Sequence, residues 1–556
     1  MSDRVIALPP DEATYTLRSA HVPVCCLERL RPEDLEGLQP CVDGLALVDI
    51  TVNGSKILSI TPAGGAARDQ LPNGHAAAHQ ALPVPHVDLR GKMVLPTFVD
   101  LHTHIDKGHT CERSRNPDGS LTGADRSTAA DAAFWDADDV RRRMEFGLAS
   151  AHAHGTAALR THLINMTPAQ TALTWPVFSR LRAEWRGRVE LQGVSLVALS
   201  FYRDAEAARA LADLVAAHGG ALGAAVCCAE RGGDPADDWT TCDRDRGELL
   251  DRWGWECWWK RGWEGCTGIF TLAKQRDLDL DFHTDENGNE AAKGLRYVAE
   301  KAIQHDYIGR VVCGHCCSLA YQSQADLDLT LDLVRRAGIT IVSLPLVNQW
   351  TQDRRLGVTP RWRGVTLMHE IRAAGVPAAL ASDNTRDQFY AYGDLDMLEV
   401  FVQGCRMAHL DRPYEDWVRS VGSVPAQAMG LEGHGTLCSG SSADFVVFRG
   451  RCYSELMSRP QHDRLVVRAG RPIDARPPPY ELLDDLNVPH EQRGAEAMVE
   501  KDVLVCASKP NGCSPAAPRH CKAPVLDRVR AYLPMVITLL VGVTLGAGTV
   551  GFAPRR

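Results

Sequence analysis

VLPTFVDLHTHIDK, residues 94–107, joins an apolar, strand-like run to two histidines that are separated by one residue. Successive side chains of a strand point to opposite faces, so His102 and His104 point to the same side. Neutral imidazole is a common metal ligand. The stretch therefore predicts a strand over residues 93–104 that brings two metal-binding groups into one cavity.

Further β-rich apolar runs follow this strand and alternate with amphipathic helical segments. Neither GxGxxG nor GxxxxGK[ST] stands at a strand exit, which disfavours a doubly wound nucleotide-binding sheet. Eight strands with helical crossovers predict the α/β fold class and a closed (β/α)8 TIM barrel over residues 93–430. The seven strands expected after the first span residues 155–164, 189–199, 220–228, 278–286, 310–317, 339–348 and 376–384.

The segments on either side of the barrel contain short apolar runs with glycine turns. Residues 16–92 and 431–475 are expected to join in one small β-sandwich domain. Residues 1–15 read as a leader, and residues 476–530, rich in proline, alanine and charge, read as a linker.

The C-terminal run, residues 531–554, contains no charged side chain and is flanked by arginines. About 20 apolar residues span a bilayer as a helix, so a C-terminal transmembrane helix that anchors the protein is expected. A packed or disordered tail is the alternative.

Tryptophan gathers in residues 229–270, which hold six of the chain's 12 tryptophans. An insertion at this point follows the fourth strand and is expected at the barrel mouth. A lid, an interaction surface and a self-packed insert all remain open.

Composition excludes several classes of protein. The 61 lysines and arginines against 70 acidic residues give a net charge of −9, which disfavours a nucleic-acid partner. Hydrophobic residues make up 45% and charged residues 24%, as in a globular protein with a large core. The acidic N-terminus lacks the apolar core of a signal peptide, so the 18 scattered cysteines are expected to be free thiols in a cytoplasmic catalytic domain.

Further titratable groups stand at the ends of later predicted strands. His283 ends the fifth, His315 the sixth and Asp383 the eighth, and barrel active sites lie at those ends. A catalytic cation keeps an open position for water and lowers the pKa of that water from 15.7 toward about 7. The residues expected to hold one divalent cation are His102, His104, His283 and Asp383.

Hydrolysis at an amidine or amide carbon also needs proton transfer. Glu286 lies three residues after His283, where the chain turns over the mouth, and suits a proton shuttle to the departing nitrogen. His315 can polarise the attacked group or orient water, and Asp383 can take the proton of the water.

Several segments over about residues 85–470 resemble the amidohydrolase superfamily, and more closely its bacterial cytosine deaminase branch. The resemblance implies an iron or zinc ion on the four ligands above, Glu286 as the proton-shuttling glutamate and His315 as the active-site histidine. It also implies a homo-oligomer that deaminates a small nucleobase-like substrate, cytosine, to uracil and ammonia. The segments are VLPTFVDLHTHIDK, GTAALRTHLI, VELQGVSLVAL, DLDFHTDE, GHCCSLA, SLPLVNQW, RWRGVTLMHE, ASDNTRDQFYAYGDLDML and GTLCSGSSADFVVF.

The residues expected to contact substrate depart from the cytosine deaminase pattern. Ala198 stands where that enzyme has a glutamine, although Gln192 is retained upstream, while Asn384 replaces an aspartate and Phe389 a tryptophan. Gln192, Asn384 and Phe389 are the expected substrate-binding residues, and creatinine, isoguanine or an N-alkyl triazine such as N-isopropylammelide are alternative substrates. Lys107 also occurs in the triazine branch, although a surface lysine is the simpler interpretation. A catalytically silent, membrane-tethered barrel is a further alternative, which the complete ligand set disfavours.

Overall fold

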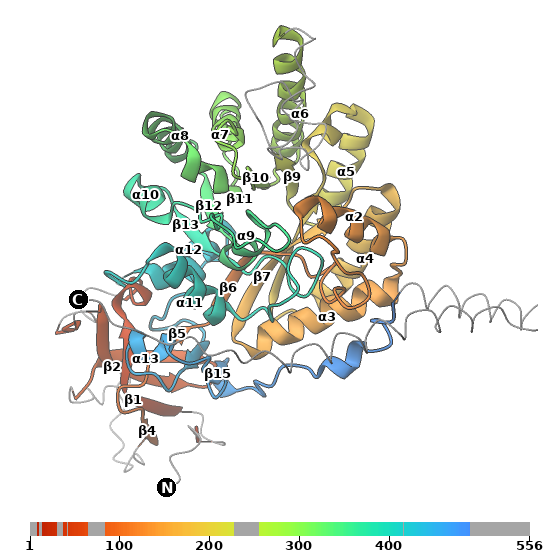
Figure 1. Ribbon diagram of the computed structural model, residues 1–556. Helices are drawn as coiled ribbons and strands as arrows, with labels where there is room; N and C mark the ends of the chain where they lie inside the picture. Colours follow the sequence, from red (N-terminus) through yellow and green to blue (C-terminus); the bar gives the residue numbers. More distant parts are fainter. Residues whose placement is uncertain are drawn as a thin grey trace, which may run out of the picture. The chain divides into compact units, whose positions relative to one another are not determined.

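Parallel strands close into a barrel in the computed structural model, which describes residues 8–9, 14–30, 37–41, 43–64, 84–226, 255–414 and 416–489 (Figure 1). For residues 255–265 it describes the backbone alone. The barrel strands are β6 (Phe98–Thr103), β7 (Thr156–Ile164), β8 (Glu190–Leu196), β9 (Leu222–Val226), β10 (Leu280–Thr284), β11 (Val311–His315), β12 (Thr340–Ser343) and β13 (Ala378–Leu380).

Two runs of parallel pairing make up the barrel wall, β6-β7-β8 and β9-β10-β11-β12-β13. Parallel bridges join the two runs: Val194 pairs with Ala221 between β8 and the start of β9, and Thr103 of β6 pairs with Asp383 just after β13. The parallel barrel predicted from the sequence is therefore confirmed.

Helices connect successive strands and cover the outside of the barrel (Figure 1). α8 shows how the sequence specifies them. Ser323 caps its first turn by accepting from the Asp326 amide, and its buried residues recur at helical spacing. The helices are α2 (Leu121–Ala132), α3 (Ala137–Ala153), α4 (Pro168–Glu184), α5 (Ala205–Ala217), α6 (Trp255–Arg276), α7 (Gly294–Gln304), α8 (Gln324–Arg336), α9 (Pro345–Thr351), α10 (Met368–Ala373), α11 (Met397–Ala408), α12 (Ser423–Ala428) and α13 (Tyr453–Met457).

Two four-stranded sheets flank the barrel. Their orders are β3-β2-β1-β4, entirely from the N-terminal side, and β16-β15-β14-β5, which mixes strands from both sides of the barrel. The strands are β1 (Thr14–Pro23), β2 (Leu45–Asn53), β3 (Lys56–Pro62), β4 (His86–Asp88), β5 (Val94–Pro96), β14 (Phe445–Val447), β15 (Leu465–Arg468) and β16 (Arg471–Pro472).

The predicted strand over residues 93–104 is wrong at its start, because the chain forms two strands there. β5 pairs antiparallel with β14, and the Thr97 amide then bonds to the Asp444 carbonyl. Pro96 has no N–H for a ladder, so the first strand ends there and β6 begins at Phe98.

One end of the barrel is closed by α12. Its Ala426 and Ala428, followed by Met429, share a buried core cluster with Val99 and Leu101 of β6. The carboxyl ends of the strands, where the histidines stand, form the opposite end.

The tryptophan-rich segment belongs in part to the barrel itself. Four of its tryptophans fall within α6, the helix between β9 and β10, so residues 255–270 are a crossover helix rather than an insertion. Three predicted features lie outside the described residues. They are the rest of the tryptophan-rich segment, the part of the linker beyond residue 489, and the membrane anchor expected over residues 531–554. Among the helices that the structure describes, none is long and apolar enough to cross a membrane.

Candidate active site

Four side chains from three separate parts of the chain meet at the carboxyl end of the barrel. His102 is the penultimate residue of β6 and His104 lies just beyond it, His283 lies on β10, and Asp383 follows β13. The Nε2 atom of His283 lies 3.2 Å from Nε2 of His102 and 3.1 Å from Nε2 of His104. The Asp383 Oδ1 atom lies 3.7 and 3.3 Å from the same two nitrogens.

These spacings fit a single cation. Bonds of 2.0–2.1 Å in a tetrahedral zinc site place neighbouring donor atoms about 3.3 Å apart. Burial, together with neighbouring histidines for His102 and His283 and with Lys107 for His104, lowers the pKa of each imidazole well below its usual value. All three rings are therefore neutral near pH 7, which is the form that binds metal. Neither oxygen of Asp383 has a hydrogen-bond partner within the described chain, so its lone pairs stay available.

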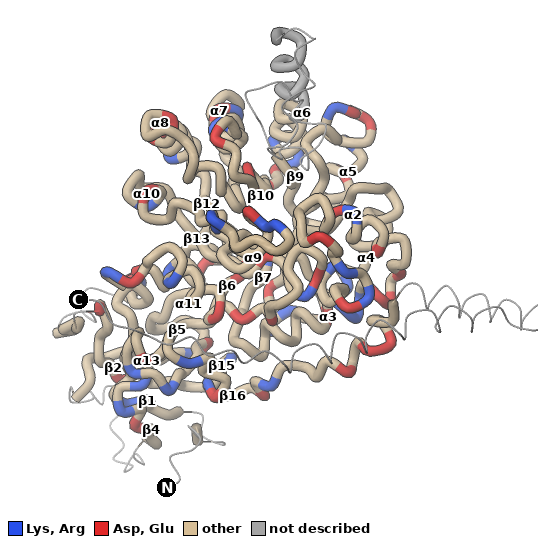
Figure 2. The backbone as a smooth tube through the Cα atoms, in the orientation of Figure 1, with Lys and Arg blue, Asp and Glu red and all other residues tan. Residues whose placement is uncertain are grey.

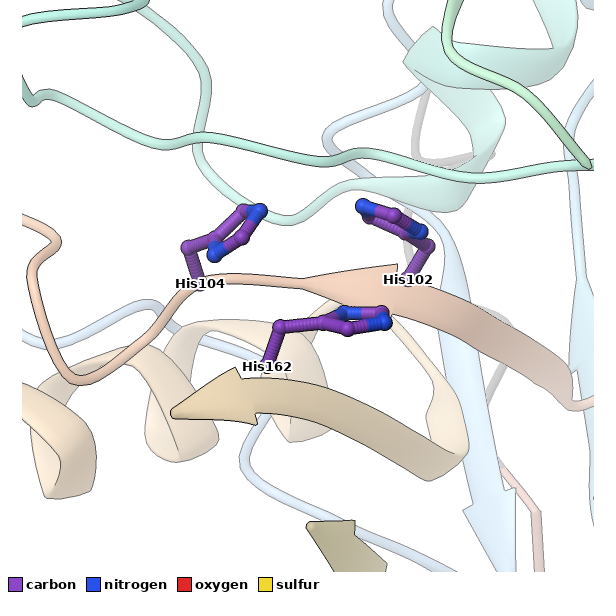
Figure 3. Close-up of side chains that lie close together, drawn as sticks. All are labelled: His102, His104 and His162. Atoms are coloured by element: carbon purple, nitrogen blue, oxygen red, sulfur yellow. The ribbon is translucent and has the colours of Figure 1, made fainter. Parts of the chain in front are cut away.

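A fourth histidine, His162 on β7, lies beside the cluster and was not expected from the sequence. Its ring centroid is 4.0 Å from that of His102, and its ring nitrogens lie close to those of His102 and His104 (Figure 3). Its Nε2 atom faces Asp281 at 3.1 Å, and Asp281 in turn accepts from Arg160 at 2.9 Å. The signal was present in GTAALRTHLI, where His162 stands near the carboxyl end of the second strand.

Glu286 and His315 are linked by one amide. Asn348 of α9 donates through Nδ2 to Nδ1 of His315 at 2.9 Å and to Oε1 of Glu286 at 3.3 Å. Because Nδ1 accepts, the proton of a neutral His315 ring lies on Nε2. Burial, followed by the charge of Asp383, raises the pKa of Glu286 well above its usual value, while burial lowers that of His315 to about 4. Burial thus favours the protonated form of the Glu286 carboxyl beside a neutral imidazole.

His315 and Asp383 hold unusual backbone conformations. Their φ angles are +68° and +66°, in the left-handed region that side chains other than glycine rarely adopt. Such strain persists where the surrounding structure enforces it and concentrates at functional sites. The Asp383 amide bonds to the His102 carbonyl, which ties the strained turn to β6.

Lys107 is buried beside the cluster, so its interpretation as a surface lysine is wrong. Its Nζ atom lies 3.6 Å from the ring centre of Phe389 and 3.8 Å from Oδ2 of Asp387. Asn384 donates to the same Oδ2 atom at 2.7 Å. Two predicted substrate-binding residues, Asn384 and Phe389, therefore share one buried assembly with Lys107 and Asp387 next to the predicted metal ligands.

Gln192, the third predicted substrate-binding residue, is not brought to this assembly. Its side-chain oxygen accepts from Arg160 at 2.9 and 3.1 Å, and its nitrogen donates to the Met429 carbonyl at 2.8 Å. Gln192 stands four residues before the end of β8, about 13 Å below the mouth at about 3.3 Å per residue. Both ends of the Gln192 amide are therefore engaged toward the closed end of the barrel, away from Lys107 and Asn384.

A small cavity opens beside the predicted metal ligands. Most of its lining is apolar, while Glu286, Asn287 and His283 supply the polar groups. Such a lining suits a flat heterocyclic ring with a few hydrogen-bonding edges. The cavity is lined by Leu121, Met166, Leu196, Ala225, Val226, His283, Glu286 and Asn287.

Comparisons with known proteins identify the family. Residues 255–474 match the amidohydrolase family model Amidohydro_3. The chain is 41% identical over 477 residues to a pterin deaminase of Rhizobium rhizogenes (strain K84 / ATCC BAA-868), covering 86% of this chain and 97% of that one. It is 26% identical over 375 residues to an N-isopropylammelide isopropyl amidohydrolase of Pseudomonas sp. (strain ADP), covering 65% of this chain and 81% of that one.

A solved structure shares the architecture. The 5-methylcytosine deaminase of Klebsiella pneumoniae liganded with 5-fluorocytosine superposes with a TM-score of 0.63 at 20% identity, covering 82% of this chain and 97% of that one. At 20% identity this structural similarity supports a shared fold alone, whereas the 41% identity with the pterin deaminase establishes the family. The chain belongs to the amidohydrolase superfamily and is one of its deaminase-like members.

Proposed function

We propose that this hydrolytic deaminase acts on a pterin and replaces the exocyclic amino group of the ring by oxygen, releasing ammonia. The observation that carries the proposal is the 41% identity that spans 97% of a pterin deaminase. The apolar cavity beside Glu286 supports it, because a pterin is a flat, two-ring heterocycle with polar edges.

We further propose that one divalent cation, zinc or iron, is held by His102, His104, His283 and Asp383. Three neutral imidazoles and a carboxylate suit either metal. When bound, the cation supplies Lewis acidity that makes water ionise near neutral pH. The orphaned oxygens of Asp383 and the converging Nε2 atoms are the features of the chain that fit such an ion.

The protein groups then supply the proton transfers. Water adds to the ring carbon that bears the amino group, and Asp383 is placed to accept its proton. Glu286, whose protonated form is favoured by burial, donates to the adjacent ring nitrogen. Its carboxylate then takes the hydroxyl proton of the adduct and passes it to the amino group, which leaves as ammonia while the carbonyl forms, and the proton held by Asp383 restores the acid. His315, with its proton on Nε2, can donate to the oxygen that adds, and Asn348 holds it in that tautomer.

Hydrolysis of an N-alkyl triazine is the second candidate. The 26% identity with the N-isopropylammelide hydrolase favours it, as does the buried Lys107 in the HIDK segment. Both candidates are cleavages of a carbon–nitrogen bond outside the ring, so the same site can perform either. Cytosine, creatinine and isoguanine serve as comparison substrates.

A substrate panel on the metal-replete full chain tests these proposals. Ammonia release from pterin, N-isopropylammelide, cytosine, isoguanine and creatinine is measured at equal concentration, alongside zinc and iron content. Isopropylamine is followed separately for the triazine. We expect pterin to exceed every other compound in kcat/KM by at least about tenfold, or about 1.4 kcal/mol of transition-state binding. Faster turnover of another compound, or none of pterin by metal-loaded protein, would reject pterin as the substrate.

A further inference from the structure

A short segment near the end of the described chain, residues 480–487, lies along α3 (Figure 1); we call it the C-terminal strap. Its Leu483 and Leu486 are buried against Phe146 of α3, in a small cluster separate from the main cores. Apolar burial therefore holds the strap to the helix.

Charged groups fasten the strap in addition. Arg142 of α3 donates to the two carboxylate oxygens of Asp485 at 2.6 and 2.7 Å, and to the Leu482 carbonyl at 2.7 Å. Arg113, itself paired with buried carboxylates, donates to the Leu486 carbonyl at 3.1 Å. Figure 2 shows acidic residues on the segment that runs beside α3. Two independent anchors thus fix the strap at its C-terminal end.

At its other end the strap reaches toward the active site through Tyr480. The Tyr480 ring stacks on Phe146, with centroids 5.9 Å apart and planes 22° apart. The guanidinium carbon of Arg386 lies 4.5 Å from the centre of the same ring. Cation–π contacts of this kind hold an arginine side chain in one place.

Arg386 belongs to the β13 loop, residues 382–392, and joins it to the β6 loop, residues 105–114. The Arg386 carbonyl accepts from the amides of Thr110 at 2.8 Å and Cys111 at 3.0 Å. Phe146 also contacts the β6 loop, because the His109 ring packs edge-on against it at 4.6 Å. Tyr480 therefore contacts Arg386, which bonds the β13 loop to the β6 loop, and Phe146, which packs against the β6 loop.

The two loops hold several of the residues that lie next to the predicted metal ligands. The β6 loop contains Lys107, and the β13 loop contains Asp383, Asn384 and Asp387. The cavity beside Glu286 is lined by other segments, but Asp383 of the β13 loop and Glu286 both lie within 4.0 Å of Nδ1 of His315, so substrate bound there would face this loop. A shift of either loop would displace the groups that orient the ring.

We propose that the C-terminal strap positions the substrate-facing loops and that Tyr480 is the positioning residue through which it acts. Tyr480 does not touch the reacting atoms; its ring fixes Arg386 and Phe146, and these fix the loops. The proposal rests on the proposed function only in the choice of substrate for the kinetic measurement.

The test compares three full-length, metal-replete variants with the unaltered protein. Tyr480→Ala removes the ring, Tyr480→Phe keeps it, and Leu482→Ala removes a neighbouring strap side chain that is 55% exposed. Hydrogen exchange is followed by mass spectrometry in residues 105–114 and 382–392, with the barrel strands as an internal reference. KM, kcat and bound metal are then measured with the substrate on which the unaltered protein is most active.

For Tyr480→Ala we expect faster exchange in both loops, unchanged exchange in the barrel strands and unchanged metal content. We expect KM to rise about two- to fivefold, the size of an exposed cation–π contact, with kcat little changed. Leu482→Ala should match the unaltered protein. Tyr480→Phe, which keeps the ring but loses the hydroxyl that faces Arg386, should lie much closer to the unaltered protein than Tyr480→Ala. Unchanged loop exchange in Tyr480→Ala, or a Tyr480→Phe variant that behaves like it, would overturn the proposal. The exchange measurement needs no substrate, so a failure to deaminate pterin would reject the proposed function and leave this test intact.

Discussion

Two residues of the site, His283 and Glu286, should separate metal binding from proton transfer. His283→Ala removes a nitrogen at the centre of the ligand set, so metal content and ammonia release should fall together. Glu286→Gln leaves the set intact and removes the acid, so bound metal should stay while kcat falls about 10²- to 10⁴-fold. Metal analysis and an ammonia assay check both. Normal turnover by Glu286→Gln would show that another group shuttles the proton.

Asn348 should control catalysis through the tautomer of His315. In Asn348→Asp a carboxylate replaces the donor to Nδ1, so the ring proton would move from Nε2 to Nδ1, away from the site. We expect kcat to fall about 10- to 100-fold, as for other residues that orient an active-site histidine, with metal content unchanged. Asn348→Gln, which can still donate, is the matched control and should lose less. Equal kcat in the two variants would contradict the tautomer argument.

The residues that could be predicted from the sequence are those whose position follows from strand geometry. His102, His104 and His283 stand at the carboxyl ends of apolar runs, where alternation alone fixes the side that they face. His162 obeys the same rule and was missed because four ligands already completed the set. Lys107 was noted, but its burial could not be predicted, because the direction of a side chain in a loop depends on contacts from distant segments, here Asp387 and Phe389.

At the scale of elements, buried ion pairs formed by α3 should stabilise the fold at neutral pH, and this contribution should be lost in acid. Asp139 of α3 accepts from Arg143 at 2.6 Å and also pairs with Arg113. Burial alone would raise the pKa of Asp139, but the two arginines outweigh burial and lower it to about 2. Because the pKa is about 3.9 in the unfolded chain, the contribution is complete above about pH 4. It amounts to about 2–3 kcal/mol and is lost as the pH falls toward 2.

Urea unfolding of the unaltered protein and of Asp139→Asn checks this contribution. At pH 7 the variant should lose about 3–5 kcal/mol in unfolding free energy, because Arg143 keeps its buried charge without a carboxylate partner and Arg113 keeps only Asp131. Between pH 4 and pH 2 the difference between the two proteins should shrink by about 2–3 kcal/mol. A difference that stays constant over that range would show that Asp139 is not ionised in the folded protein.

Element boundaries were harder to predict than element types. The apolar run over residues 93–104 reads as one strand, yet its two halves pair with different sheets. Sequence alternation cannot reveal which partner a strand has, because pairing is decided by the distant β14 and β7. The prediction of an insertion over residues 229–270 was wrong for α6 because it relied on the unusual tryptophan content. That helix occupies the ordinary crossover position between β9 and β10.

At the scale of the whole molecule, the cation is expected to stabilise the barrel by linking its two runs of strands. Its expected ligands come from β6, in one run of strands, and from β10 and the turn after β13, in the other. In the described chain the two runs meet near the site through two isolated bridges, Thr103 with Asp383 and Ala198 with Ala225. A cation that binds only the folded barrel therefore adds a link where the backbone pairing is sparse.

Chelation should consequently lower the Tm of the unaltered protein by several degrees. Binding to the folded state at a thousandfold excess over Kd contributes about 4 kcal/mol, and removal of the ion forfeits it. His283→Ala lacks a ligand, so its Tm should start lower and respond little to chelator. Calorimetry with and without chelator, followed by return of zinc or iron, checks both statements. If the Tm of the unaltered protein is unmoved after its metal has demonstrably been removed, the ion contributes chemistry alone and the barrel closes without it.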